Sequence, residues 1–363
     1  MIRRMMPTHN CEVLRKKFRG CLLGSLLGDC LGAPFEGDFI SAGEKIVIKN
    51  YFDKLETPDF KGPIKQYTDD TAMTRCVAKA LIDKPEPDFT LMAKLFVKEY
   101  FLEPKRGYGQ NVITVFKKLK QSRFQDIFKP ASEQFNGSGS LGNGGAMRIA
   151  PLALYFFDKD DLLVDAATKA TKITHTHPLG VNGALLQCMA IQQCFMTKHG
   201  DKIDVHKFVE ELLHKMKPFE YEEDEDFEEI LEKPYREKLL LIQNLLHRTY
   251  ENDELYDEVL ETLGNNISAL ESVPTAIYCF LKACAETPEM KDIFRNAVEY
   301  AITLGGDTDT IASMTGAIAG AYVGEEHLNK NVIENCEKHK ETIEMADNLL
   351  AARQEETAEM KNS

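Results

Sequence analysis

The chain has 363 residues, of which 43% are hydrophobic and 28% are charged, and its formal net charge is −14. This hydrophobic fraction is enough to build a core, whereas the negative charge repels polyanions, so no direct binding to DNA or RNA is expected. The sequence contains no apolar run of the roughly 18 residues that a membrane span needs. Its nine cysteines are irregularly spaced and form no CxxC pair, which indicates reduced thiols in an intracellular protein.

The N-terminal part of the chain changes character at about residue 18. Residues 1–17 are rich in Lys and Arg, and we expect a flexible tail, with a mitochondrial targeting segment as the alternative. Residues 18–38 carry leucines at helical spacing and a glycine at every fourth position from Gly20 to Gly32, which predicts a buried core helix. Glu36 follows on a glycine-flanked loop and is either a solvated turn residue or a metal ligand on a mobile loop.

Two acidic motifs share one pattern, a pair of aspartates next to threonines and followed by a helical segment. QYTDDTAM contains Asp69 and Asp70 flanked by threonines, and LGGDTDTIASMTGAIAGAYVG contains Asp307 and Asp309. Each motif precedes a helical pattern, and the second helix has a face of small residues that would admit a neighbouring backbone. The aspartates could simply cap these helices, but carboxylate and hydroxyl oxygens are also the ligands that Mg²⁺ prefers. If the fold joins the motifs, they form a site for one or two divalent cations.

A glycine-rich stretch, FNGSGSLGNGGAMR (135–148), leads into a helical pattern. Its amide N–H groups and the start of a helix could hold a diphosphate without a basic residue, although a merely flexible loop is an equal alternative. The RGYG turn (106–109) is too short to specify chemistry. His175 could line a pocket, and His177 is expected in a turn before Pro178.

The remaining chain is dominated by helical patterns, with helices expected within 87–120, 182–196, 205–216, 234–250, 255–263 and 274–285. Strand-like alternation is almost absent, so we predict an all-α protein with one domain over residues 18–352. The acidic stretch 219–232 is expected to be a surface insertion, and residues 353–363 a C-terminal tail.

The order and content of the motifs resemble the ADP-ribosylglycohydrolase (DraG-like) family. The resemblance rests on GDCLGAPFEGD, YTDDTAM, GNGGAMR and LGGDTDTIASMTGAIAGAYVG, which span residues from about 18 to 325. RGYG, QFNG and SVPTAIYCF are similar to the ADP-ribosyl-serine hydrolase branch, which also degrades poly(ADP-ribose). The resemblance implies a compact, orthogonal multi-helix fold with a central site for two Mg²⁺ ions.

The resemblance also implies roles for individual residues. The metal ligands would be Glu36, Thr68, Asp69, Asp70, Asp307, Asp309 and Thr310. Contacts to the ADP-ribose would come from Asp70, Gly107, Gly109, Phe135, Ser140, Leu141, Gly142, Asn143, His175 and Ile267. Leu141 stands where relatives carry an aromatic residue, which alters the surface on which the adenosine would stack. Glu36 and Asp307 are the two candidates for the catalytic base, and the sequence does not decide between them.

The implied reaction is hydrolysis of the bond between ADP-ribose and a serine oxygen, of ribose–ribose bonds in poly(ADP-ribose), and of O-acetyl-ADP-ribose. Alternatives are the arginine-specific branch and a non-catalytic, crystallin-like or ADP-ribose-binding relative. The expected partners are ADP-ribosylated proteins and poly(ADP-ribose), with ADP-ribose as product. A monomer in the nucleus and cytoplasm, with the mitochondrial matrix as a further location, is expected.

Overall fold

A computed structural model describes residues 10–84, 86–198, 200–220, 233–248 and 253–362. These residues form α-helices and short 3₁₀ turns and contain no β-strand, which confirms the expected all-α fold. No helix among them is long and apolar enough to cross a membrane. The α-helices are α1 (Asn10–Gly32), α2 (Ala42–Glu56), α3 (Asp69–Asp83), α4 (Phe89–Leu102), α5 (Gln110–Gln121), α6 (Lys129–Ser132), α7 (Ala150–Tyr155), α8 (Asp160–Lys172), α9 (Pro178–Met196), α10 (Val205–Met216), α11 (Pro234–Leu246), α12 (Asp253–Thr262), α13 (Ala269–Glu286), α14 (Met290–Thr303), α15 (Thr308–Val323), α16 (Lys330–Glu334) and α17 (His339–Asn362). The 3₁₀ turns are η1 (Ala33–Phe35), η2 (Gln134–Gly137), η3 (Asn143–Gly145), η4 (Lys217–Phe219) and η5 (Glu325–His327).

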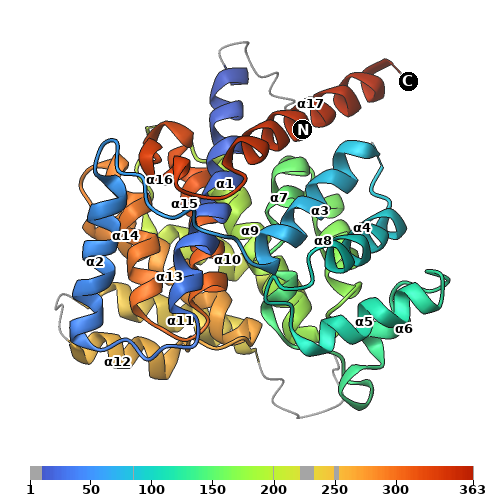
Figure 1. The fold of residues 1–363 in the computed structure, drawn as a ribbon, viewed down its shortest axis with the longest axis horizontal. Helices are drawn as coiled ribbons and strands as arrows, with labels where there is room; N and C mark the ends of the chain where they lie inside the picture. Colours follow the sequence, from blue (N-terminus) through green and yellow to red (C-terminus); the bar gives the residue numbers. More distant parts are fainter. Residues whose placement is uncertain (1–9, 85, 199, 221–232, 249–252, 363) are drawn as a thin grey trace.

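Helices α1 and α15 form the central pair of the molecule (Figure 1). The glycines that repeat every four residues in α1 face the small residues of α15: Gly20 meets Gly320, Gly24 meets Gly316, Gly28 meets Ala312 and Gly32 meets Thr308. A Cβ atom added at Gly24 would lie 2.1 Å from the carbonyl oxygen of Gly316, so no larger residue fits. We call this contact the glycine seam. The close contact along the seam compensates the stability that glycine costs inside a helix.

The two helices run antiparallel, because residue numbers rise along α1 as they fall along α15. The last turn of α1 therefore lies beside the first turn of α15. The loop that follows α1 is tied to the turn before α15 by two backbone hydrogen bonds, Gly37 N to Gly306 O at 2.8 Å and Gly306 N to Asp38 O at 3.2 Å. Gly306 and its neighbour Gly305 both have a φ of 70°, a conformation that favours glycine. The seam thus brings the loop of Glu36 to the start of α15.

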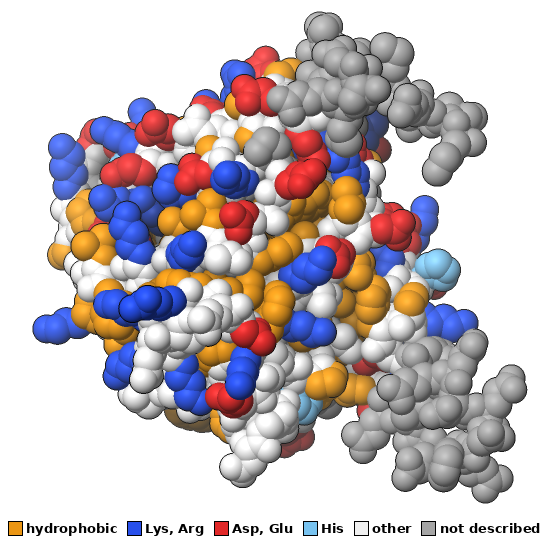
Figure 2. Space-filling view, turned by 90° about the vertical axis from the view of Figure 1, so that its right-hand side faces the viewer, with side chains coloured by type: hydrophobic (Ala, Val, Ile, Leu, Met, Phe, Trp, Pro, Cys, Tyr) orange, Lys and Arg blue, Asp and Glu red, His pale blue; other side chains and the backbone are white. Residues whose placement is uncertain are grey.

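The other helices surround this pair (Figure 1). Helices α9, α13 and α14 pack against α15, and α17 packs against α1 and α3. One cluster of buried hydrophobic side chains includes residues from α1 to α17. On the face shown in Figure 2, basic and acidic side chains are interleaved. Ion pairs in the described chain include Lys79–Asp83, Lys118–Glu133 and Lys169–Asp165.

The expected tails at both ends are too long. Helix α1 begins at Asn10, and its Lys17 is buried and donates hydrogen bonds to the carbonyls of Cys194 and Phe195 at the end of α9. Helix α17 continues to Asn362, and its Arg353 is buried and pairs with Asp158 and Glu356. Lys17, one of the basic residues that suggested a solvated tail, is therefore buried against the end of α9.

The expected acidic insertion falls mostly outside the described residues, which omit 221–232. Of its first two residues, Phe219 ends η4, and Glu220 accepts hydrogen bonds from the backbone N–H groups of Tyr235 and Arg236 at 2.7 and 2.9 Å. Glu220 is therefore held by the start of α11.

Candidate metal centre and substrate site

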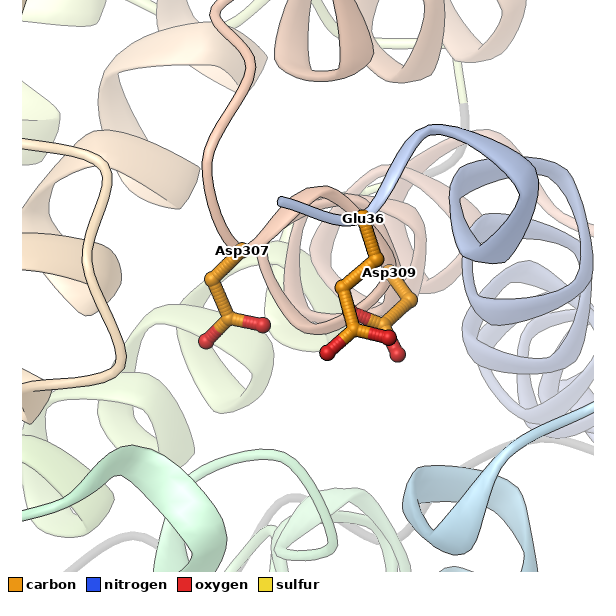
Figure 3. Close-up of side chains that lie close together, drawn as sticks. All are labelled: Glu36, Asp307 and Asp309. Carbon is orange, nitrogen blue, oxygen red and sulfur yellow. The ribbon is translucent and has the colours of Figure 1, made fainter. Parts of the chain in front are cut away.

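Three carboxylates meet where α1 ends and α15 begins. Glu36, Asp307 and Asp309 each offer an oxygen atom, and these atoms all lie within 4.8 Å of one another (Figure 3). The two aspartates are buried, whereas Glu36 is exposed. Figure 3 shows the three carboxylates on the same side of the loop that carries Glu36. Three oxygen ligands at this spacing can hold a divalent cation.

Asp307 stands at the N-cap position of α15, but its side chain makes no capping hydrogen bond. Its Oδ2 atom instead accepts a hydrogen bond of 2.6 Å from Nδ2 of Asn143, which belongs to the glycine-rich stretch. Capping by the Asp307 side chain, one of the two interpretations left open by the sequence, is therefore wrong. The bond joins the acidic site to the expected ligand-binding stretch.

Helix α3 adds the second pair of aspartates. The hydroxyl of Thr68 caps α3 by accepting from Asp70 N at 3.3 Å. Thr310 Oγ1 donates to Asp70 Oδ1 at 3.4 Å across 240 positions of sequence, so the two acidic motifs meet in space as predicted. The other oxygen of Asp70 is buried and has no hydrogen-bond partner among the described residues. A buried carboxylate oxygen without a partner is costly, and a bound cation would compensate it.

Burial and mutual repulsion dominate the electrostatics of this site. Burial and the charge of Asp307 raise the pKa of Asp309 to about 7. Burial, and then the charge of Asp309, raise the pKa values of Asp69 and Asp70 well above the usual range. The charge of Asp309, and then burial, raise the pKa of Glu36. None of these carboxylates forms an ion pair with a Lys or Arg of the described residues, so positive charge from a metal ion fits the site.

Asp29 is a part of this site that the sequence analysis missed. It is fully buried in α1, and its carboxylate accepts hydrogen bonds from Thr68 N at 2.9 Å, Thr71 N at 3.0 Å and Thr71 Oγ1 at 2.6 Å. Burial and the charge of Asp309 raise the pKa of Asp29 to about 7. Asp29 thereby fixes the start of α3, and with it Asp69 and Asp70. The only signal of this role in the sequence is an acid inside an apolar helical pattern.

The glycine-rich stretch borders the acidic site. Its backbone pairs with the residues around the start of α13, through Asn143 N to Ile267 O at 2.9 Å and Ala269 N to Leu141 O at 3.1 Å. Leu141 and Ile267 are 41% and 72% exposed, so both present apolar surface beside the site. The Ser140 hydroxyl accepts from Gly142 N at 3.3 Å. His175 lies against the same stretch, because a Cβ atom added at Gly142 would be 3.3 Å from its Nε2 atom.

The sequence predicts that the glycine-rich stretch leads directly into a helix, but in the structure it does not. It forms the short turn η3, and α7 starts only at Ala150, where Pro151 occupies the first turn. The predicted helix start at the glycines is therefore wrong. Any anion held there would rely on the backbone N–H groups of the loop and on His175.

The other expected contacts lie at different distances from the acids. Gly107 has a φ of 92°, and a Cβ atom there would be 3.5 Å from Asp69 Oδ1, so this turn borders the acids. Gly109 is the N-cap residue of α5 and is exposed. Phe135 is 54% exposed in η2. His177 caps α9 by accepting from Leu179 N at 3.1 Å, which gives it a structural role.

Comparison with known proteins decides the family. The sequence model of the ADP-ribosylglycohydrolase family matches residues 10–359. The chain belongs to this family. This ADP-ribosylglycohydrolase is 41% identical to a chicken protein and 41% identical to a human protein, both named ADP-ribosylhydrolase ARH3, with 92% of each chain covered in both comparisons. An uncharacterized Escherichia coli protein, YegU, is 28% identical, over 85% of this chain and 88% of its own.

A solved structure shares the fold. The chain titled ADP-ribosylglycohydrolase-related protein complex is 20% identical and superposes with a TM-score of 0.63, over 94% of this chain and 99% of its own. The expected multi-helix ADP-ribosylglycohydrolase fold is thereby confirmed, and the resemblance read from the sequence motifs is correct.

Proposed function

We propose that this ADP-ribosylglycohydrolase is a Mg²⁺-dependent enzyme that releases ADP-ribose from serine side chains and cleaves the ribose–ribose bonds of poly(ADP-ribose). O-acetyl-ADP-ribose is a further substrate. The observation that carries the proposal is the meeting of Asp307 and Asp309 with Glu36 and the α3 aspartates in one partly buried site. The similarity to proteins named ADP-ribosylhydrolase ARH3 supports the choice of substrate.

The oxygen-rich residue set suits a hard divalent cation, and we propose that it holds two Mg²⁺ ions. The ligands would be Glu36, Thr68, Asp69, Asp70, Asp307, Asp309 and Thr310. Bound Mg²⁺ supplies positive charge that polarises sugar oxygens and makes a nearby water more acidic. The unpartnered oxygen of Asp70 and the absence of a basic partner for the acids within the described residues support a cation there.

In the proposed reaction a water oxygen bonds to the anomeric carbon of the distal ribose while the bond from that carbon to the serine oxygen breaks. A carboxylate takes one proton of the water and a proton is passed on to the departing serine oxygen, so water and ADP-ribosyl-serine give ADP-ribose and serine and the carboxylate is left unchanged. Glu36 suits the role of base, because it is exposed at the edge of the site and its pKa is raised. Asp307 suits it less, since Asn143 already donates a hydrogen bond to its Oδ2 atom.

The substrate would lie across the glycine-rich stretch. Backbone N–H groups of the loop and His175 would hold the diphosphate, which orients the ribose over the acids. Leu141 and Ile267 would offer apolar surface to the adenosine, and the resemblance adds Gly107, Gly109, Phe135, Ser140, Gly142 and Asn143. We expect the enzyme to act as a monomer; this state, its cellular location and the lack of nucleic-acid binding stay predictions.

Turnover of peptides that carry ADP-ribose on serine or on arginine tests the proposal. We expect release from serine with Mg²⁺ and none with EDTA. Asp309→Asn should abolish turnover, whereas the matched surface variant Asp161→Asn should retain it. Release from arginine alone would replace our substrate with that of the arginine-specific branch. Binding of ADP-ribose without release from either would identify a non-catalytic relative.

A further inference from the structure

Arg148 is a buried cation without an acidic partner. Its side chain is 1% exposed, and no ion pair joins it to a carboxylate of the described residues. Nη1 donates to Gly144 O at 2.6 Å, and Nη2 donates to Ala170 O at 3.0 Å and to Thr174 Oγ1 at 2.7 Å. The guanidinium lies over the ring of Phe96 at 4.8 Å. All of its hydrogen-bond acceptors are neutral, so negative charge reaches it only through space, from Asp69, and not through an ion pair.

The hydrogen bond from Arg148 to Thr174 determines the direction of the hydrogen bond between Thr174 and His175. A threonine hydroxyl has one hydrogen and accepts on its lone pairs, whereas a guanidinium only donates. The Thr174 hydroxyl therefore accepts from Arg148, and its own hydrogen is free for His175 Nδ1, which lies 2.7 Å from Oγ1. With the opposite direction, the buried hydroxyl hydrogen would have no acceptor among the described residues.

The hydrogen bond accepted by Nδ1 of His175 determines where the proton of the ring lies. If Nδ1 accepts, the single proton of the neutral ring must sit on Nε2. The ring is held beneath the glycine-rich stretch, because a Cβ atom at Gly144 would be 3.0 Å from Nε2 and 2.6 Å from Cε1. Burial and then the charge of Arg148 lower the pKa of His175 to about 3, so the ring stays neutral. Nε2 itself has no hydrogen-bond partner among the described residues.

We propose that Arg148 and Thr174 are positioning residues that hold His175 with its proton on Nε2 and aim this N–H at an anionic oxygen of the ligand. This inference rests on the proposed function for the identity of the ligand, which is the diphosphate of ADP-ribose. The buried charge of Arg148 strengthens the N–H as a donor without meeting the ligand. An acidic protein thereby recognises an anion through a neutral histidine, with the positive charge of Arg148 buried behind it.

The proton position can be measured in the free protein. Two-bond ¹H–¹⁵N spectra of histidine-labelled protein distinguish a protonated from an unprotonated ring nitrogen, and His175→Gln assigns the signal among the nine histidines. We expect a neutral His175 with the proton on Nε2 at pH 7. A proton on Nδ1, or a cationic ring, overturns the proposal. Because no substrate is involved, this result is independent of whether the protein hydrolyses ADP-ribosyl-serine.

The effect on binding is tested with three variants and ADP-ribose as the probe, measured by calorimetry. Thr174→Val removes the relaying hydroxyl, and we expect affinity to fall about tenfold. Thr174→Ser restores the hydroxyl and should restore affinity. Thr171→Val is the matched control, because the Thr171 hydroxyl is equally buried and has no hydrogen-bond partner in the described chain.

The same variants separate positioning from general damage. For Thr174→Val, KM should rise and kcat should change little, and the ring spectrum should lose its single proton position. Equal losses of ADP-ribose affinity in Thr174→Val and Thr171→Val, or no recovery of affinity in Thr174→Ser, overturn the proposed hydrogen-bond chain from Arg148 through Thr174 to His175. A wild-type spectrum with the proton on Nε2 in a protein that does not cleave ADP-ribosyl-serine would instead refute the proposed function and keep the relay.

Discussion

The two ends of the α1–α15 pair are stabilised in opposite ways. Along the glycine seam, backbone meets backbone with no room for a methyl group, and the polar side chains there are paired, as Ser25 Oγ is with Ser313 Oγ at 3.0 Å. At the end of the same seam, Asp307, Asp309 and Glu36 meet within 4.8 Å, and their charges repel. The seam therefore has one low-energy arrangement of its own, whereas the acidic site is held together by the structure around it.

This difference explains how a repulsive site can persist. Close packing in a protein interior is stiff, so a well-packed seam can impose geometry on groups that would otherwise separate. The N-terminus of α15 adds a favourable interaction with Asp309, and Asp29 fixes the start of α3 from the neighbouring turn of α1.

The largest effect is expected from Gly24→Ala in the seam. Inside a helix this change usually adds about 1 kcal/mol of stability. Here the new methyl group would lie 2.1 Å from the Gly316 carbonyl, so we expect a loss of about 4 kcal/mol or failure to fold. Gly43→Ala in α2 is the control, because its Cβ would meet only Ser41 Oγ at 3.9 Å. Urea unfolding measures the free energy of unfolding of both variants. Equal values for Gly24→Ala and Gly43→Ala would show that the seam is not closely packed at Gly24.

Sequence alone captured the local parts of this arrangement. The leucine and glycine periods predicted the helix of α1, and the paired aspartates predicted the acidic site, because both signals lie within a few neighbouring residues. The register that sets Gly28 against Ala312 is a property of two helices and left no trace in either pattern. The same holds for Asp29, whose role depends on which backbone N–H groups face it.

The second prediction concerns pH and metal removal. The pKa of Asp309 is about 7 in the folded protein, above its ordinary value of about 3.9. Between these values the folded state binds more protons than the unfolded state, so its stability falls as pH rises from about 4 to about 7. In EDTA we expect Asp309→Asn to be more stable than the wild type by on the order of 2–3 kcal/mol at pH 7.5, and by little at pH 4.5.

Thermal unfolding across this pH range, with and without Mg²⁺, checks the prediction. Added Mg²⁺ should stabilise the wild type at pH 7.5 and have little effect on Asp309→Asn. A stability difference between the two proteins that does not change with pH would mean that Asp309 carries no repulsion, and the contrast between the seam and the acids would disappear.

A smaller effect is expected from Asp29→Asn. The amide offers one acceptor oxygen where the carboxylate accepts from Thr68 N, Thr71 N and the Thr71 hydroxyl, so we expect a loss of about 1–2 kcal/mol at pH 5, where the raised pKa of Asp29 leaves little buried charge for the amide to relieve. Because the start of α3 would shift, Mg²⁺ affinity should fall about 10–100-fold. The control Asp88→Asn also alters a carboxylate that accepts a backbone N–H, from Leu91 at 2.8 Å, but asparagine caps a helix equally well. Calorimetry with Mg²⁺ compares the two.

The smallest effect on stability is expected from Glu36→Gln, because this side chain is exposed and its loop is held by backbone bonds of Gly37 and Gly306. We expect unfolding to change by less than about 0.5 kcal/mol while turnover falls about 100-fold or more. Asp38→Asn, on the same exposed loop, should leave both unchanged. If Glu36→Gln instead stabilised the metal-free protein as strongly as Asp309→Asn, Glu36 would belong to the repelling core of the site. It would then be a structural ligand, and Asp307 would remain as the base.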